Sequence, residues 1–295
     1  MLETRRAAAY SLNGMTTTLT LAIERGLVAP RPDVSDPATL VWVDYEGIPS
    51  AYFYRAEDEY WAYLPAVGAF RSEPDGRVLA VPNEHASDAL VVDTYRRTIA
   101  PMTLQLLGRQ VLHASAIETA DGVIGFCADS QTGKSTIAFG LSRCGYRVCA
   151  DDALAFETGD SGARMLELPF SVRLRPGSAA YFGVPVPPPP ALDAEGRIVV
   201  GGRTASLSAL CILSRQSEGR GVELSRLGAA EVIQTLLPHA YCFTLLDEEL
   251  KRRTVEEYLR LAAQVPVYEA RFTATLDELP SLLAEIERVL IREAA

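Results

Sequence analysis

A short segment combines a glycine, a lysine and a serine in a spacing that suits the binding of phosphate groups. The segment is ADSQTGKST, residues 128–136. It fits the pattern of a loop that ends in Gly-Lys-Ser and leads into a helix. In such a loop Gly133 lets the backbone N–H groups approach a polyphosphate, Lys134 supplies a cation and the Ser135 hydroxyl ligates Mg²⁺. The segment therefore predicts a site for ATP and Mg²⁺.

The neighbours of this loop support the prediction. The apolar run VIGFC at 123–127 indicates a strand before it, and a helical pattern follows it up to Gly145. Such a helix places the positive end of its dipole at a bound anion. Ala128 stands where the pattern has glycine, so weaker nucleotide binding is expected. The residues expected to contact the phosphates are Ala128, Asp129, Ser130, Gln131, Thr132, Gly133, Lys134, Ser135 and Thr136.

Two adjacent aspartates, Asp151 and Asp152, follow the run YRVCA at 146–150. Neighbouring residues of a strand point to opposite faces, so both carboxylates reach one site only if the strand ends before them. A carboxylate there could hold Mg²⁺ or accept the proton of an attacking hydroxyl. The alternative is a solvated acidic turn, but the carboxyl end of a strand beside a phosphate loop favours a site.

A histidine and an arginine are further candidates. His113 lies in VLHASAIE, an expected strand before the loop strand, although a lone histidine often packs in a core. Arg203, in GGRT, could clamp a phosphate with two parallel hydrogen bonds, although an exposed loop arginine is the plainer interpretation. The sequence has 3 histidines, and its 5 cysteines show no CxxC spacing. A zinc site is therefore not expected, and the cysteines are expected to be reduced and buried.

The elements that would position these residues fall into two regions, 1–105 and 106–295. Short runs of β-forming residues between turn formers predict a β-rich N-terminal region with no recognisable chemistry. These runs lie at 17–22, 40–44, 51–55, 60–64 and 77–81. A helical spacing over 88–108 is interrupted near Pro101.

The second region reads as strand, loop, helix and strand from about 110 to 155, which predicts a parallel sheet with helical cover. Consecutive prolines at 187–190 predict an extended excursion over 176–203. Further strands are expected at 207–213 and 266–272, and helices at 228–237, 248–265 and 278–294.

Composition narrows the classes of function. The chain has 295 residues, 48% of them hydrophobic, which suits a globular protein with a substantial core. A net charge of −10 disfavours a general nucleic-acid binder, because phosphate backbones require a basic face. No long apolar run or secretory signal is evident, so a cytoplasmic protein without a membrane partner is expected.

These segments occur in an order that resembles the catalytic domain of HPr kinase/phosphorylase. In that family a histidine-bearing strand precedes a GDSGxGKS-type loop, and a GHRLxADD segment follows. The matching residues here are Asp129, Ser130, Gly133, Lys134, Ser135, Gly145, Arg147, Ala150, Asp151 and Asp152. The segment VVGGRTASLSALCIL is similar, more weakly, to VRPGRNLA of the family. The likeness is strong over 110–155 and weak over 156–295.

The resemblance implies an α/β fold with a P-loop, HPr-kinase-like catalytic domain and a mixed or parallel sheet, behind the β-rich N-terminal region. It implies that His113, Lys134, Asp151, Asp152 and Arg203 form the catalytic centre. It also implies that Ser135 and Asp152 ligate Mg²⁺, with Glu167 as the nearest candidate for a third ligand. Gln131 and Thr132 depart from the usual glycine-rich pair. A homo-oligomer is compatible with the resemblance.

Three functions remain open from the sequence. The N-terminal region differs from that of the bacterial carbon-regulation enzyme, and the layout is similar to divergent HPr-kinase-related proteins that phosphorylate a serine on lasso-type precursor peptides. The first hypothesis is therefore a peptide-serine kinase. The second is a kinase of an HPr-like protein or of a small hydroxylated metabolite. The third, motivated by Ala128 and the altered loop, is a nucleotide-binding regulator without transfer activity.

Overall fold

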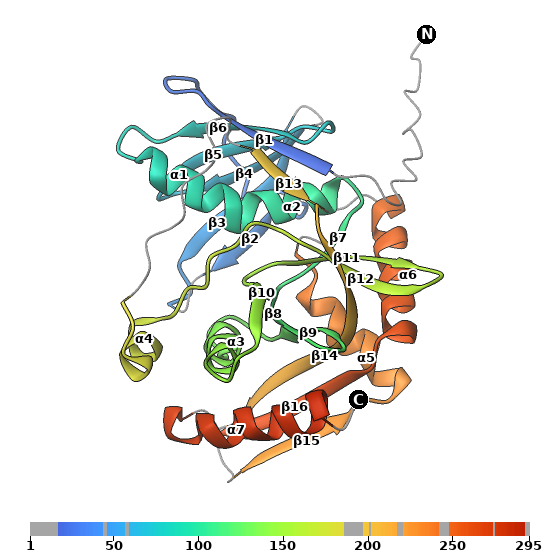
Figure 1. Ribbon diagram of the computed structural model, residues 1–295. Coiled ribbons are helices and arrows are strands. Elements are labelled where there is room, and N and C mark those ends of the chain that lie inside the picture. Colours follow the sequence, from blue (N-terminus) through green and yellow to red (C-terminus); the bar gives the residue numbers. More distant parts are fainter. Residues whose placement is uncertain are drawn as a thin grey trace.

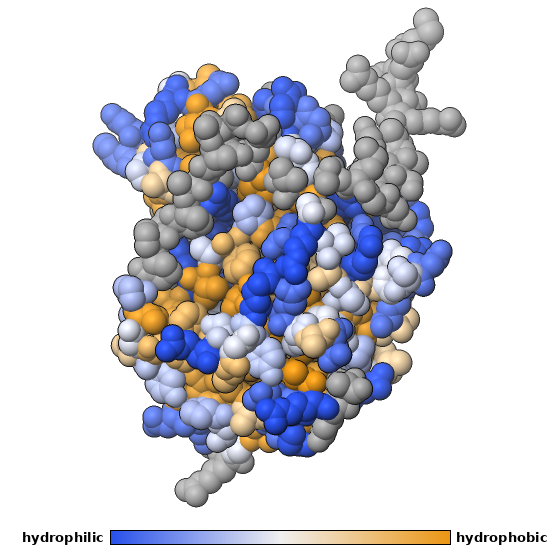
Figure 2. Space-filling view, viewed as in Figure 1, coloured by the Kyte–Doolittle hydropathy of each residue, from blue (hydrophilic) through white to orange (hydrophobic). Residues whose placement is uncertain are grey.

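The chain forms a mixed α/β fold built around two β-sheets, with helices between and around them (Figure 1). The computed structural model describes residues 17–43, 46–56, 59–185, 197–200, 202–216, 221–241, 248–273 and 275–292. Within these residues no helix has the length and apolar character needed to cross a bilayer. On the face of the molecule seen in Figure 2, hydrophilic and hydrophobic residues are interspersed.

The first sheet contains the strands expected in the N-terminal region and two more. Its strand order is β13-β1-β6-β5-β4-β3-β2. The strands are β1 (Thr17–Ile23), β2 (Leu40–Val43), β3 (Pro49–Ala56), β4 (Glu59–Leu64), β5 (Gly68–Ser72), β6 (Arg77–Pro82) and β13 (Arg197–Val200). The sequence pattern missed β5 and β13. Because β13 pairs with β1, the sheet is completed by a segment from the second half of the chain.

The second sheet carries the predicted loop and the acidic pair. Its strand order is β10-β8-β9-β14-β12-β11-β7, with β16 beside β14 and β15 beside β16. The strands are β7 (Gln110–Leu112), β8 (Ala114–Thr119), β9 (Gly122–Cys127), β10 (Arg147–Ala150), β11 (Leu154–Gly159), β12 (Gly162–Leu166), β14 (Thr204–Gln216), β15 (Val222–Arg226) and β16 (Val267–Thr273). The sheet is mixed, since β9, β14 and β16 run parallel while β8 runs antiparallel to β9.

Two expected strands are broken in the structure. The run VLHASAIE divides at His113 into β7 and β8, which lie at different places in the sheet. The run from Tyr146 onward divides at the acidic pair, because β10 ends at Ala150 and β11 begins at Leu154. Both breaks place polar residues outside the strand ladders, where their side chains are free to face a common site.

Helices fill the space between the sheets and cover the second one (Figure 1). The expected helix over 88–108 is α1 (Asp88–Thr94), the π-helical turn η1 (Tyr95–Ile99) and α2 (Ala100–Leu106). The remaining helical elements are α3 (Lys134–Arg143), α4 (Pro176–Phe182), α5 (Ala229–Leu236), η2 (Leu237–His239), α6 (Glu248–Gln264), η4 (Leu276–Glu278), α7 (Leu279–Ile286) and η5 (Glu287–Arg292). The expected extended segment at 176–203 thus contains a helix and a strand, and its residues 186–196 and 201 lie outside the described residues.

One hydrophobic core joins the two sheets through α1, η1 and α2. It contains Phe53 and Phe70 of the first sheet, Tyr95 of η1, and Ala155 and Leu166 of the second. Burial of this shared apolar surface holds the N-terminal region against the sheet that carries the loop. Of the cysteines, Cys127, Cys149 and Cys211 are buried as expected and free, whereas Cys144 is exposed; Cys242 lies outside the described residues.

Candidate active site

A cavity of about 970 Å³ lies where the parallel strands β9, β14 and β16 end. Its size falls within the roughly 300–1,000 Å³ that small-molecule sites occupy. Residues 130–137 line it on the side of β9, Arg215 at the end of β14 and Thr273 at the end of β16. The carboxyl ends of parallel strands are the usual place for a ligand in an open α/β sheet.

The loop between β9 and α3 turns sharply through two left-handed residues. Gly133 has φ 116° and Gln131 has φ 74°. Only glycine adopts such angles without a steric cost, so Gln131 holds a strained backbone at the edge of the cavity. Ala128 does not have a positive φ, so its Cβ adds no strain of this kind.

The Lys134 side chain folds back over this loop. Its Nζ donates to the carbonyl oxygens of Ala128 at 2.8 Å and Asp129 at 3.2 Å, and the residue is buried while lining the cavity. Burial lowers the pKa of the ammonium, and the negative charge of Asp152 opposes that shift. The Lys134 Nζ thus lies beside the helix N-terminus, where phosphate oxygens could replace the two carbonyl oxygens.

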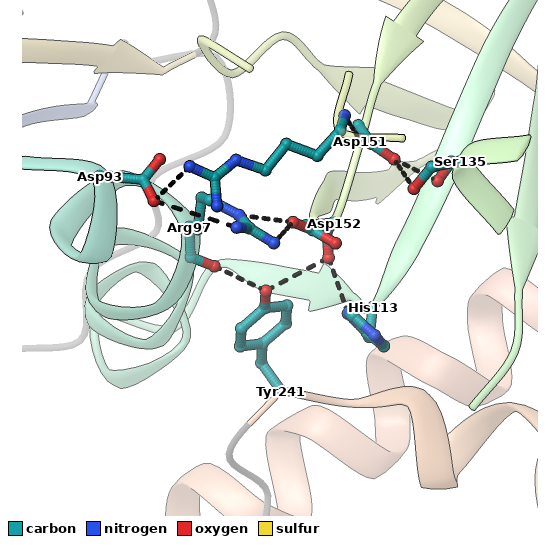
Figure 3. A network of polar contacts seen from close by, with 9 residues as sticks. Asp93, Arg97, His113, Ser135, Asp151, Asp152 and Tyr241 are labelled. Carbon is teal, nitrogen blue, oxygen red and sulfur yellow. Dashed lines mark hydrogen bonds and ion pairs between the residues drawn. The ribbon is translucent and has the colours of Figure 1, made fainter. Parts of the chain in front are cut away.

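Asp151 is held against the loop by three donors. Its Oδ1 accepts from Ser115 Oγ at 2.6 Å and from Ser135 Oγ at 2.7 Å, and its Oδ2 accepts from the Arg173 backbone N–H at 3.0 Å (Figure 3). Burial and the neighbouring Asp152 raise the pKa of this carboxyl, and the hydrogen bonds oppose the rise. The arrangement fixes the Ser135 hydroxyl at the start of α3.

Asp152 faces the cavity from a left-handed backbone, with φ 65°. Its carboxylate pairs with Arg97, with Oδ2 at 2.7 Å from Nε and 2.5 Å from Nη2 (Figure 3). Its carbonyl oxygen lies 2.9 Å from His113 Nδ1 and 3.2 Å from the Tyr241 hydroxyl. These contacts hold a conformation that costs about 1–3 kcal/mol for a residue with a side chain.

His113 lines the cavity beside this pair. Since its Nδ1 faces a carbonyl oxygen, that nitrogen carries the proton and the neutral ring leaves Nε2 unprotonated. Burial and the positive charge of Lys134 lower the pKa of the imidazole. The ring is therefore neutral near pH 7 and positions Asp152 through its carbonyl.

Arg97 of η1 lines the cavity from the N-terminal region and lies four residues before Pro101. Proline has no N–H, so it cannot donate to the carbonyl of Arg97 four residues earlier. That carbonyl instead accepts from the Tyr241 hydroxyl at 2.8 Å. Arg97 also lies 4.0 Å from Asp93, which pairs with Arg173 at 3.0 Å. Burial opposes the charged form of Arg97, but its ion pairs with Asp152 and Asp93 raise its pKa overall. Arg97 and Arg173 both line the cavity.

Two predicted site residues are not brought to this cavity. Glu167 and Arg203 line a separate, shallower hollow of about 520 Å³. Arg203 pairs with Glu118 at 2.6 Å, and Arg147 lies between Glu118 and Glu167 at 2.6 and 3.4 Å. The weak likeness over 156–295 placed Glu167 and Arg203 in the centre, whereas their surface ion pairs hold them outside it.

The groups that sequence reasoning missed are Ser115, Arg97, Arg173 and Tyr241. Ser115 lies two residues after His113, and in the single strand expected over VLHASAIE the two side chains would share a face, which was a usable signal. The other three come from segments distant in the sequence, and no spacing rule connects them to the loop.

The oxygen atoms of Ser135 and Asp151 suit a magnesium ion. Mg²⁺ takes one or two protein oxygens and completes its shell with water and phosphate oxygens. The Ser135 hydroxyl and the Asp151 carboxylate are 2.7 Å apart at the start of α3. The sequence predicted Asp152 as a ligand, and the structure places Asp151 rather than Asp152 against the Ser135 hydroxyl. Within the described residues no group of three or more His, Cys, Asp or Glu side chains is arranged to hold a metal ion.

The left-handed Gln131 gives a test of the loop conformation. Glycine at this position should raise the free energy of unfolding by about 0.5–1 kcal/mol, because relief of about 1–2 kcal/mol of strain exceeds the added chain entropy. Thr132→Gly is the control, since Thr132 has no positive φ and should lose about 0.5–1 kcal/mol. Urea unfolding measures both, and equal destabilisation by the two changes would contradict the loop geometry.

A buried histidine behind the site predicts a dependence of stability on pH. Burial lowers the pKa of His239 from its ordinary 6.5 to about 4. The unfolded chain therefore binds the proton first as pH falls, and stability present above pH 6.5 is lost progressively toward pH 4. Between pH 7 and pH 5 the loss should be about 2 kcal/mol from this residue. Urea unfolding should show that the free energy of unfolding falls less between pH 7 and pH 5 in His239→Gln than in wild type. Equal losses in the two proteins would contradict the prediction.

Comparison with known proteins adds little to this geometry. No family model and no curated protein matches the chain. Among solved structures, the HPr(Ser) kinase/phosphatase from Coxiella burnetii is similar to 62% of this chain and 98% of its own chain, with 12% sequence identity and a TM-score of 0.32. Values this low do not establish a shared fold or activity.

Proposed function

We propose that this protein is a phosphotransferase that uses Mg-ATP to phosphorylate a serine hydroxyl of a peptide or protein. The observation that carries the proposal is that Lys134 and Asp152 line one cavity while Asp151 holds the Ser135 hydroxyl at its edge. Phosphoryl transfer needs positioning and charge stabilisation more than covalent help from the protein, and these residues supply both.

Each of these residues has a distinct role in the proposed reaction. The 128–136 loop and Lys134 bind the phosphates, and Ser135 with Asp151 would hold Mg²⁺, which offsets the phosphate charge. Asp152 accepts the hydrogen bond, and then the proton, of the attacking hydroxyl. The hydroxyl oxygen bonds to the γ-phosphorus as the bond to the bridging oxygen breaks and ADP leaves. Arg97 and Arg173 face the charge that develops on the transferred group.

The acceptor is proposed from the sequence resemblance alone. A serine of a lasso-type precursor peptide is the first candidate, and an HPr-like protein or a small hydroxylated metabolite is the alternative. Incubation with Mg-ATP and each acceptor should add about 80 Da to the true one, the mass of one phosphate. A protein that binds ATP and phosphorylates none of these acceptors would contradict the proposal.

One observation favours a second candidate, a nucleotide-binding regulator without transfer activity. The Lys134 ammonium already bonds to its own loop, and the Asp152 carboxylate already pairs with Arg97. A regulator would bind ATP without turnover, and alanine at Asp152 would leave its behaviour unchanged. Mass spectrometry of the acceptors together with ADP release separates the two functions.

A further inference from the structure

The cavity has two chemically different ends. One end is charged and carries Arg97, His113, Asp152 and Arg173. The other end carries a group of apolar residues together with Arg215 and Glu278. Its apolar residues are Val222, Phe272, Leu276, Leu279 and Leu282. A ligand that spans the cavity therefore meets mainly charged groups at one end and an apolar wall at the other.

The order of strands places these ends on opposite sides of the 128–136 loop. The loop follows β9, and β8 and then β10, which leads to Asp152, lie on one side of that strand. β14 and then β16 lie on the other side. Because β16 leads to Leu276 and β15 begins at Val222, the apolar end lies across the loop from the charged end.

We propose that the apolar end binds the base and ribose of a nucleotide whose phosphates occupy the 128–136 loop. This inference rests on the proposed function and adds the direction in which the nucleotide lies. A nucleobase presents two flat apolar faces, which gain free energy when hydrocarbon covers them. At the charged end the same base would displace water from Arg97 and Asp152 without replacing their hydrogen bonds.

Two side chains are placed to cover the base. Val222 and Leu276 line the cavity, are half-buried and pack against the core beneath α3 and α7. Phe272 and Leu282 are buried below them. The exposed apolar surface of Val222 and Leu276 is thus held on a rigid support and faces the space where the base would lie.

A few polar groups at this end suit the edge of a base or a ribose. Thr273, Thr275 and Glu278 line the same end, and the Thr273 hydroxyl bonds to the Glu278 carboxylate. Ligand sites commonly combine an apolar wall with a small number of polar groups that fix orientation. With the base here, the γ-phosphate points toward Asp152, and the acceptor hydroxyl enters from the charged end.

The test compares ATP with inorganic tripolyphosphate, which has phosphates and no base. Glutamine at Leu276 or Val222 should weaken ATP binding by about five- to tenfold, the loss expected when a partly exposed side chain no longer offers apolar surface. Tripolyphosphate binding should change by less than about twofold, because that ligand makes no contact with the apolar end. Leu259→Gln on α6 is the matched control, since Leu259 is exposed and does not line the cavity. Calorimetry in the presence of Mg²⁺ measures all affinities.

The outcomes separate this inference from the proposed function. If wild type binds both ligands and the Leu276 and Val222 variants keep the same affinity for ATP, the proposed base site is wrong. The proposed phosphate site is unaffected by that result. Equal weakening of both ligands in folded variants also overturns it. Wild type that binds neither ligand overturns both proposals.

A second measurement uses the unaltered protein. An ATP analogue with a photoreactive azide on its base should label peptides that contain residues 221–226 or 275–282. Labelling confined to residues 88–113 would place the base at the charged end and overturn the inference.

Discussion

Replacing Lys134 with methionine should lower the rate of phosphate transfer by about a thousandfold, since one preorganised charge donor at a phosphoryl group contributes at least that order. The ammonium is buried beside the N-terminus of α3 and donates to the carbonyl oxygens of Ala128 and Asp129, which a phosphate can replace. ATP affinity should fall with the rate, because the same cation binds the ground state. Steady-state kinetics and calorimetry measure both quantities.

Lys251 offers a matched control. It lies on α6, pairs with Glu248 at 3.1 Å and does not line the cavity. Lys251→Met should keep full activity. If both methionine variants retain activity while folding normally, Lys134 is not a phosphate ligand and the site assignment is wrong.

Replacing Asp152 with asparagine should lower the turnover number by about a thousandfold, within the range that general base catalysis contributes. Asparagine keeps the size of the side chain and tolerates the left-handed φ of 65°, so the loop should retain its shape while the carboxylate is lost. ATP affinity should change little, because the proposed partner of Asp152 is the acceptor hydroxyl. The effect should therefore appear in the turnover number rather than in nucleotide binding.

Asp160→Asn is the control for this change, since Asp160 lies in the exposed turn between β11 and β12. It should leave both quantities unaltered. A full turnover number for Asp152→Asn with a normal melting temperature would remove Asp152 from the chemistry. The regulator without transfer activity would then be the better function.

Local spacing in the sequence was enough to predict the central element of the site. The strand β9, the loop and α3 lie next to one another in the chain, and short-range rules relate them. The same holds for Asp151 and Asp152, which were expected after the end of a strand and follow Ala150, the last residue of β10. Such features depend on backbone geometry over a few residues, so the sequence contains them.

The weak resemblance over residues 156–295 led to two predicted site residues that do not line the cavity. Glu167 and Arg203 were assigned from it, and they lie in a separate hollow with Glu118 and Arg147. The strand-loop-helix pattern alone predicted a parallel sheet, and the resemblance allowed a mixed or a parallel one; the sheet is mixed, because β8 runs antiparallel to β9. Pairing between strands is set by contacts across the sheet, and the pattern of one segment does not specify its neighbour.

The sequence by itself determined that a Gly-Lys-Ser loop, a following helix and an acidic pair exist in this chain. Only the tertiary structure decided that Arg97 and Tyr241 meet Asp152 across separations of 55 and 89 residues, that Asp151 holds Ser135, and that one cavity has a charged and an apolar end. The physical reason is that covalent spacing fixes neighbours along the chain. Contacts between distant segments form only when burial of a shared core offsets the entropy of bringing those segments together.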